Sequence, residues 1–149
     1  MKKSLLTCMA IVCLCLQTKA DNKATWFRNS AISPDGKTIA FSYKGDIYTV
    51  DAQGGQARRL TSHPAYDGYP KWSPDSKSIA FASDRYGNSD IFVVSASGGK
   101  PKRLTTHSVS EVPEAFLDNG HILYSAAIMP DVKDLAFPGS FKQVWSVDT

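Results

Sequence analysis

The sequence contains one block of residues twice and a third time in altered form. Trp72–Phe81 repeats Ile32–Phe41, and further along Arg103–His107 repeats Arg59–His63. A looser third copy is found at Phe116–Tyr124. An internal period of about 40–45 residues filled with short strands is typical of β-propeller blades. The repeat therefore explains most of the polar residues as scaffold before any chemistry is considered.

Each repeat is predicted to hold four short antiparallel strands. Turn-forming residues divide the second repeat into expected strands at 69–73, 78–83, 90–95 and 101–105. The first repeat has the same plan, with Gly45-Asp46 as a shorter hairpin, and no helical periodicity is present. The predicted fold class is all-β: a partial propeller with two complete four-stranded blades and an incomplete third. The blades are expected at about 28–63, 69–107 and 113–149.

The second strand of each repeat predicts how the blades stack. Large side chains (Ile39, Phe41, Tyr43) alternate with small ones (Thr38, Ala40, Ser42), and residues 78–83 repeat this alternation. Neither face carries a charge. The large face of one blade is therefore expected to fill the small face of its neighbour, because a lone blade cannot bury both faces.

The third repeat departs from this plan. Residues 127–140 contain two prolines and a glycine, which indicates an inserted loop. Gln143–Val147 then matches Asp90–Val94, and the chain stops before a counterpart of Arg103–Thr105. Closed propellers need about four to eight blades, and natural proteins avoid open sheet edges. We expect either a longer polypeptide or several copies in a ring, and a stop within a blade favours the longer polypeptide.

Residues 1–20 are predicted to be a secretory signal peptide. Two lysines open the chain, Leu5–Leu16 is an uncharged apolar run, and Thr18-Lys19-Ala20 places small residues where a signal peptidase cuts. The run is too short for a membrane span. A lipid anchor at Cys15 is disfavoured because the bulky Leu14 precedes it.

Loss of this segment changes the composition. The whole chain has 17 Lys+Arg against 14 Asp+Glu, but Lys2, Lys3, Lys19 and all three cysteines lie within the first twenty residues. The remainder is neutral, so its charge indicates neither nucleic acid nor an acidic membrane as a partner. It also has no disulfide framework, so its core must hold it together. We expect an exported protein, periplasmic or secreted, without a membrane span after cleavage.

The repeats resemble the TolB-type, WD-like propeller repeat, whose core is a W-S-P-D-G-K-x-I-A-F block followed by D-I-Y-V and G-G-x-x-x-R-L-T. This chain carries the three parts in that order, at Trp72–Phe81, Asp90–Val94 and Gly98–Thr105. The resemblance implies a propeller fold, which hosts many unrelated activities.

A narrower resemblance is to the amino-terminal propeller of exported tricorn-type proteases. It rests on a first blade directly after the signal peptide, Leu60–Asp67, Ser83–Asn88, and Phe137-Pro138 in the third-blade insertion. The resemblance implies a large serine peptidase with a PDZ module and a tail-specific-protease domain. The catalytic serine and histidine belong to that distant domain, and no residue here matches its motif.

Candidate histidines and serines are expected to be structural. His63 and His107 occupy the same place in two repeats, whereas a catalytic or metal-binding histidine is normally singular; His121 is expected to be exposed beside a turn. Ser33 and Ser73 lie in Ser-Pro-Asp turns and are predicted to bond nearby backbone groups. The chain contains no Gly-x-Ser-x-Gly nucleophile elbow.

The remaining candidates also favour scaffold roles. Asp84, Asn88 and Asp90 offer oxygen ligands but lack the spacing of a calcium loop; Asp84 and Asn88 are expected to shape the hairpin, with Arg85 pairing nearby. Phosphate-loop, zinc and dinucleotide patterns are absent, so no catalytic, metal or cofactor-binding residue is predicted. The tryptophans Trp26, Trp72 and Trp145 are expected in the core or at blade contacts.

The leading expectation is a non-catalytic propeller segment of an exported tricorn-like serine peptidase. It would guide peptide or protein substrates to a carboxy-terminal catalytic domain of the same polypeptide, with a homo-oligomer as a further possibility. One alternative is a TolB-like periplasmic propeller that binds protein partners. Another is the propeller lid of a prolyl-oligopeptidase-like hydrolase.

We predict that the signal peptide is cleaved after Ala20, because the apolar run and the small residues at the cut site lie at the required distances. Mass spectrometry of the exported protein should find Asp21 at the amino terminus. An intact Met1, or a lipid on Cys15, would contradict the prediction.

Overall fold

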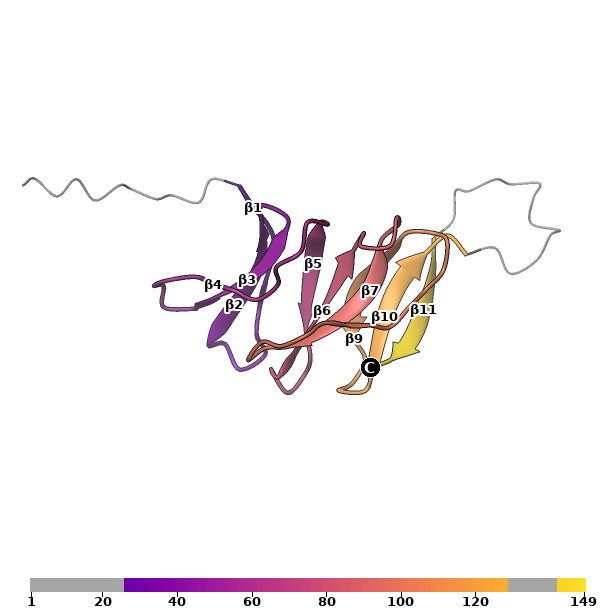
Figure 1. Ribbon diagram of the computed structural model, residues 1–149. Helices are drawn as coiled ribbons and strands as arrows, with labels where there is room; N and C mark the ends of the chain where they lie inside the picture. The colour runs from indigo at the N-terminus through magenta and orange to yellow at the C-terminus, as the bar shows by residue number, and fades with distance from the viewer. Residues whose placement is uncertain (1–25, 129–141) are drawn as a thin grey trace, which may run out of the picture.

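The computed structural model describes residues 26–128 and 142–149. In these residues every regular element is a β-strand, and the strands form three antiparallel sheets (Figure 1). The all-β partial propeller predicted from the repeats is thereby confirmed. The signal peptide and most of the inserted loop at 127–140 lie outside the described residues.

Each sheet is built from consecutive strands. Blade 1 contains β1 (Phe27–Ile32), β2 (Thr38–Tyr43), β3 (Asp46–Asp51) and β4 (Arg58–Arg59). Blade 2 contains β5 (Asp67–Trp72), β6 (Ser78–Ser83), β7 (Asp90–Ser95) and β8 (Lys102–Arg103). Blade 3 contains β9 (Glu111–Phe116), β10 (His121–Ala126) and β11 (Gln143–Asp148).

The predicted strands of blade 2 differ from the observed ones at both edges, and the inner strand expected at 69–73 is found at Asp67–Trp72. The expected strand at 101–105 shrinks to Lys102–Arg103. The reason is that Thr105 uses its side chain instead of its backbone: its hydroxyl accepts a hydrogen bond from the Ile91 amide at 2.9 Å. The shorter hairpin of blade 1 has Lys44 and Gly45 at its tip, so Asp46 already belongs to β3.

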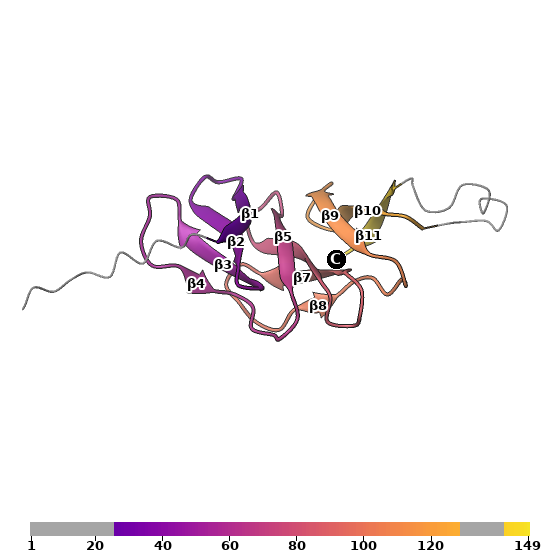
Figure 2. The same cartoon turned by 90° about the horizontal axis from the view of Figure 1, so that it is seen from above.

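The blades lie side by side, and they come closest to one another at their first strands. Within each sheet the strand order follows the chain, so β1, β5 and β9 each form one edge. β1 contacts β5, and β5 contacts β9. Figure 2 shows these three strands toward one side of the row, with the outer strands β4 and β8 toward the other. The first strands are therefore the inner strands of the propeller.

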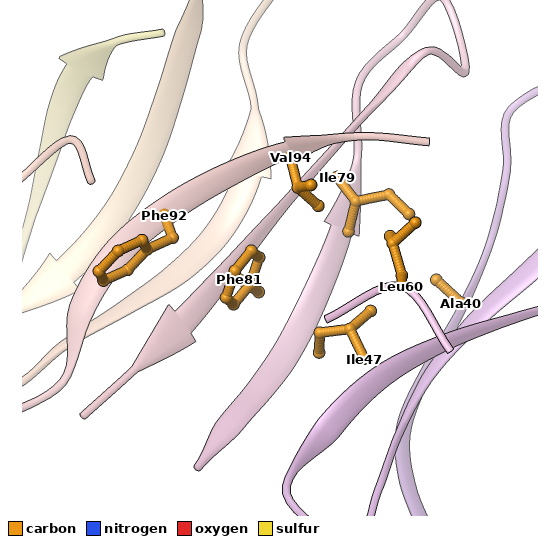
Figure 3. Close-up of a cluster of buried hydrophobic side chains, with 7 residues drawn as sticks. All are labelled: Ala40, Ile47, Leu60, Ile79, Phe81, Phe92 and Val94. Atoms are coloured by element: carbon orange, nitrogen blue, oxygen red, sulfur yellow. The ribbon is translucent and has the colours of Figure 1, made fainter. Parts of the chain in front are cut away.

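The faces of neighbouring blades pack large against small, as the alternation along the second strands predicts. Ala40, Ile47 and Leu60 of blade 1 face Ile79, Phe81, Phe92 and Val94 of blade 2 (Figure 3). Phe81 is completely buried, and its ring stacks on Phe92 with 5.7 Å between centroids. Burying an apolar side chain of this size contributes about 1.5–3 kcal/mol. The blade interface is therefore the main core of the fold.

The interface between blades 2 and 3 repeats this arrangement. Ala80 and Ile91 from the small face of blade 2 pack with Ile122 and Tyr124 of blade 3. Leu104 packs against this cluster, as its repeat equivalent Leu60 packs in the first one. Both leucine amides donate to the third strand of their own blade, each at 2.8 Å. The equivalence of the two repeats thus extends to single hydrogen bonds.

The large face of blade 1 is only half-buried. Phe41 stacks on Tyr48 with 5.9 Å between centroids, as Phe81 stacks on Phe92, yet both blade 1 rings retain exposed surface. A hollow of about 520 Å³ lies over this face, lined in part by Phe41, Tyr48 and Val50. Among the described residues no sheet covers it, which leaves this face without the partner that blades 2 and 3 each have.

Polar bonds connect the blades at the turns. The Asp35 amide donates to the Ser76 hydroxyl at 3.2 Å, and the Asp75 amide donates to the Asn119 side-chain oxygen at 3.1 Å. The Trp72 indole donates to the Ala31 carbonyl at 3.0 Å. Each blade therefore bonds back to the one before it, and Trp72 makes the blade contact expected of it.

Each inner strand contains a bulge. The pairing of β1, β5 and β9 with the second strand of its blade shifts by one residue near the middle. Asn29 and Tyr69, at equivalent bulge positions, have φ of 50° and 57°. This region costs about 1–2 kcal/mol for a residue such as tyrosine. The bulges bend the inner edge where the blades converge.

We predict that Phe81→Ala lowers the free energy of unfolding by about 3–5 kcal/mol, because it empties a fully buried aromatic site. Urea titration of the complete gene product measures the loss. Leu117→Ala, at a site that is 64% exposed, should stay within about 0.5 kcal/mol and serves as the control. Phe41→Ala should match Phe81→Ala only where another sheet covers blade 1. A loss under about 1 kcal/mol for Phe81→Ala would contradict the packing.

Candidate functional site

The two ends of the blades differ in character. The hairpin end, toward the top of Figure 1, carries the β2–β3 and β6–β7 hairpins and the connections 60–66 and 104–110 between blades. The turn end carries the Ser-Pro-Asp turns and the glycine pairs 54–55 and 98–99. Loops at one end of a rigid scaffold are where binding residues concentrate.

Exposed aromatic side chains gather at the hairpin end. Trp26 is 71% exposed and Tyr86 is 63% exposed, and both lie in or beside its loops. Phe27 and Tyr66 also lie at this end and are 59% and 43% exposed. At the turn end, the large apolar residues that remain exposed are Ile32 and Leu117. Exposed aromatic groups beside one another mark interaction sites more often than scattered ones do.

A groove of about 610 Å³ has Trp26 and Tyr66 in its lining and lies between the β2–β3 hairpin and the connection that leads into blade 2. We call it the aromatic groove. Its described lining has three aromatic rings, two cationic side chains and no carboxylate. The residues that line it are Trp26, Arg28, Ser42, Tyr43, Lys44, Gly45, Pro64, Ala65 and Tyr66.

The cationic side of the groove is fixed by a tight turn. Lys44 and Gly45 form a two-residue hairpin loop with φ of 51° and 86°, the combination of a type I′ turn. The Lys44 ammonium lies 5.4 Å from the centre of the Tyr43 ring, within the range of a cation–π interaction. Arg28 lies on β1 and is exposed. Both charges therefore sit on the walls of the groove.

The backbone at Tyr66 is held by hydrogen bonds, and its ring lies against Gly68, which has no side chain. Its amide donates to the Asp84 carboxylate at 2.7 Å, and the following Asp67 amide donates to the Gly45 carbonyl at 2.8 Å. A β-carbon added at Gly68 would lie 2.7 Å from the Tyr66 ring. The Tyr66 ring therefore lies over Gly68, on a backbone tied to Asp84 and to the β2–β3 hairpin.

Three ion pairs lie near the hairpin end, and two of them repeat. Asp46 pairs with Arg59 at 2.6 Å, and the equivalent Asp90 pairs with Arg103 at 2.7 Å. Asp67 pairs with Arg85 at 2.6 Å. In each repeated pair the aspartate begins the third strand and the arginine lies on the fourth. These pairs join the outer strand to its sheet, so they belong to the scaffold.

The Ser-Pro-Asp turns behave as predicted. The Ser33 hydroxyl donates to Asp35 at 2.6 Å and accepts from the Thr38 amide at 2.9 Å, and Ser73 makes the same two bonds with Asp75 and Ser78. Each serine hydroxyl thus donates one hydrogen bond and accepts another within its own turn. The hydrogen bond from each serine lowers the pKa of its aspartate. Both serines therefore stabilise turns.

The histidines do not converge on one site. His63 and His107 are exposed at the hairpin end of different blades. The His63 ring accepts from the Ala65 amide at 3.1 Å, and the His107 carbonyl accepts from Asn88 at 2.8 Å. His121 is exposed at the turn end, where its ring lies 2.9 Å from Asp118, which raises the pKa of His121.

Two expectations from the sequence need correction. Asp84 and Asn88 were expected to shape their hairpin, but their side chains instead hold the connections before β5 and β9: Asp84 binds Tyr66, and Asn88 donates to His107 and Val109. Trp26 is not a core residue. It precedes β1, where the described residues offer no blade face to cover it, so it lies at the groove.

Sequence reasoning missed the aromatic groove as a unit. Trp26, the Lys44-Gly45 turn and Tyr66 lie far apart in the sequence. Trp26 and Tyr66 occupy the same place in two repeats, directly before the first strand, and Ser110 stands there in the third. The loss of the aromatic residue at Ser110, together with the unusually short Lys44-Gly45 turn, is the signal that could have found them. Residues that a repeat does not require are candidates for function.

Glu111 is a buried acid whose pKa differs from its ordinary value. It is fully buried at the start of β9, where the Thr105 hydroxyl donates to it. Burial raises the pKa of Glu111, and the Asp90 carboxylate acts in the same direction. The Thr105 hydrogen bond, His107 and Arg103 act the opposite way. The group therefore prefers its protonated form more strongly in the folded protein than in the unfolded chain.

Within 26–128 and 142–149, no three acidic, histidine or cysteine side chains come together in a way that could hold a metal ion. Over the same ranges, no helix has the length and hydropathy needed to cross a membrane.

The stacked four-stranded sheets, with their first strands converging, define a partial β-propeller. The chain belongs to the family of tricorn protease N-terminal β-propeller domains, which matches residues 24–149. The resemblance found in the sequence is therefore confirmed at the level of the family.

Individual relatives are similar over only part of their length. An uncharacterized peptidase of Bacillus subtilis (strain 168), YuxL, is 46% identical over 52 residues, which are 32% of this chain and 8% of that one. A putative TolB from Agrobacterium tumefaciens superposes with a TM-score of 0.69 at 26% identity, over 85% of this chain and 47% of that one. The tricorn protease superposes with a TM-score of 0.56 at 20% identity, over 70% and 11%. The chain thus spans less than half the length of each.

We predict that Glu111→Gln removes a pH-dependent part of the stability. Because the folded pKa is raised, the stabilisation from this group is complete below the ordinary value of 4.5 and is lost as pH rises through the raised pKa. From about pH 4.5 to 7, the wild type should therefore lose stability relative to the glutamine variant.

Urea midpoints of both proteins at the two pH values measure this difference. Glu114→Gln removes a carboxylate from an exposed position of the same strand and controls for net charge. Parallel pH profiles of the wild type and Glu111→Gln would contradict the prediction.

Proposed function

We propose that this chain is a non-catalytic propeller segment of an exported tricorn-like serine peptidase. In this role it admits or guides peptides toward a catalytic domain elsewhere in the same polypeptide. The observation that carries the proposal is the match of residues 24–149 to the tricorn protease N-terminal propeller family. The similarity of YuxL, named as a peptidase, supports the same class.

The arrangement of polar residues supports a guiding role over a catalytic one. Ser33 and Ser73 are engaged in turn hydrogen bonds, and His63 and His107 lie on different blades. The repeated Asp–Arg pairs close the outer strands. What remains available at the hairpin end is a groove lined by aromatic rings and cations, a surface suited to binding.

A TolB-like protein-binding propeller is the second candidate. The superposition on the Agrobacterium TolB, with a TM-score of 0.69 and 26% identity, favours it. Such a protein would bind partners without hydrolysing peptides. The propeller lid of a prolyl-oligopeptidase-like hydrolase would differ from both by an α/β-hydrolase domain in the same reading frame.

We predict that peptidase activity requires more than residues 21–149. Purified segment 21–149 should not cleave fluorogenic peptides, whereas the complete gene product should cleave them and lose that activity to a serine-directed inhibitor. The segment alone should also aggregate or unfold in part, because the large face of blade 1 is only half-buried and no sheet within the described residues covers it.

Three results would count against the proposal. A complete product that binds proteins but cleaves nothing favours the TolB-like candidate. Activity from an α/β-hydrolase domain favours the prolyl-oligopeptidase-like one. Turnover by a monomeric, folded segment, abolished by changing His63 or His107, would overturn the scaffold role given to those histidines.

A further inference from the structure

We infer that the aromatic groove binds an extended segment of polypeptide through its acidic and aromatic side chains. The inference deepens the proposed function and rests on it, since it names the kind of sequence that the propeller selects. The segment is held by its interior side chains, so a free terminus is not required.

Charge complementarity identifies the acidic part of the ligand. Arg28 and Lys44 bring two positive charges to the groove, and its described lining contains no carboxylate to neutralise them. The Tyr43 ring holds the Lys44 ammonium at 5.4 Å from its centre, which keeps the charge at the wall. A glutamate or aspartate of the ligand would pair with these cations.

The rings identify the aromatic part of the ligand. Trp26 is 71% exposed and Tyr66 is 43% exposed, so both present uncovered faces. Tyr66 is already in position because it lies across Gly68 and its amide is bonded to Asp84. Binding therefore requires little ordering of the backbone at Tyr66. An aromatic side chain packed on these rings gains both buried area and ring contact.

Most of the groove lies away from the uncovered large face of blade 1, although Tyr43 lines both the groove and the hollow over that face. Arg28 and Ser42 lie on β1 and β2, while Pro64–Tyr66 belongs to the connection that enters blade 2. The Asp67 amide ties that connection to the hairpin by its bond to the Gly45 carbonyl at 2.8 Å. A sheet stacked on the large face of blade 1 would leave these two walls in place.

A peptide fits the groove better than a nucleic acid. Single-stranded nucleic acids need a cationic track along several phosphates together with stacking rings. Here the cations in the groove are two, and residues 21–149 carry equal numbers of acidic and basic side chains. A localised pair of charges matches one or two carboxylates.

Fluorescence anisotropy on the complete gene product tests the inference. The probe is a fluorescein-labelled dodecapeptide of Gly, Phe and Glu, acetylated and amidated so that it carries no terminal charge. The matched probe replaces every Glu with Lys. The acidic probe should bind at least about tenfold more tightly, and about 0.5 M salt should weaken its binding, because the pairs are partly exposed.

Neutral variants of similar size locate the site. Arg28→Gln and Lys44→Gln should each weaken binding of the acidic probe about threefold, and the double variant about tenfold. The control is Lys37→Gln with Lys77→Gln, which removes two exposed charges from the turn end and should leave binding unchanged. Gly68→Ala should also weaken binding, because the added β-carbon displaces the Tyr66 ring. Arg28→Glu with Lys44→Glu should reverse the preference toward the basic probe, which a merely unfolded variant would not do.

The outcomes separate this inference from the proposed function. Groove-dependent binding in a product without peptidase activity upholds the inference and defeats the proposed function. If the product has peptidase activity but the wild type and the Arg28→Gln/Lys44→Gln variant bind the acidic probe equally, the inference is wrong and the proposed function stands. Equal loss in the groove and control variants, or tighter binding of a thymidine oligonucleotide than of the acidic probe, also overturns it.

Discussion

A sheet with two uncharged faces cannot stand alone in water, and each blade of this protein is such a sheet. Phe81 and Ile79 on one face of blade 2 and Ala80 and Ile91 on the other are all fully buried. Stacking large against small faces is the arrangement that buries both. The stability of the row is then approximately a sum over blades and the interfaces between them. Phe41 is only half-buried because, within the described residues, the large face of blade 1 has no blade interface to contribute to that sum.

The charged groups near the core serve the same architecture. Asp46 and Asp90 each pair with an arginine of the outer strand, and Thr61 and Thr105 each accept a hydrogen bond from the third strand at 2.9 Å. These bonds recur because blades 1 and 2 each end in a two-residue outer strand that must be joined to its sheet. Function is therefore to be sought where the repeat breaks. Lys44 and Tyr66 lie at such places, and the structure brings them together.

The sequence predicted those features that depend on alternation and turns. Strands 78–83 and 90–95 were placed to the residue, the large and small faces of blades 1 and 2 were assigned correctly, and the serine turns formed the expected bonds. Repetition made these predictions reliable, since two copies constrain one another. The outer strand was predicted too long because a threonine hydroxyl replaced a backbone bond.

Features that depend on packing between distant segments were not predictable in this way. Trp26 is expected in the core or at a blade contact only by analogy with Trp72 and Trp145, which fall on strand positions. The residues around Trp26 in the sequence do not show which surface its ring contacts. The groove likewise needs β1, a hairpin and a blade connection to meet in space. Local sequence patterns do not predict contacts between distant segments unless the contacting segments are themselves part of the repeat.

Two hydrogen bonds between turns at the turn end run the same way, from the backbone of one blade to a side chain of the next. Ser76 of blade 2 accepts from the turn of blade 1, and Asn119 of blade 3 accepts from the turn of blade 2. The corresponding position of blade 1 is Gly36, which has no side chain with which to reach backward. Any sheet that covers blade 1 must do so without this bond. The copies of a duplicated unit have thus become distinguishable at one turn position, because blade 1 lacks the side chain that blades 2 and 3 use there.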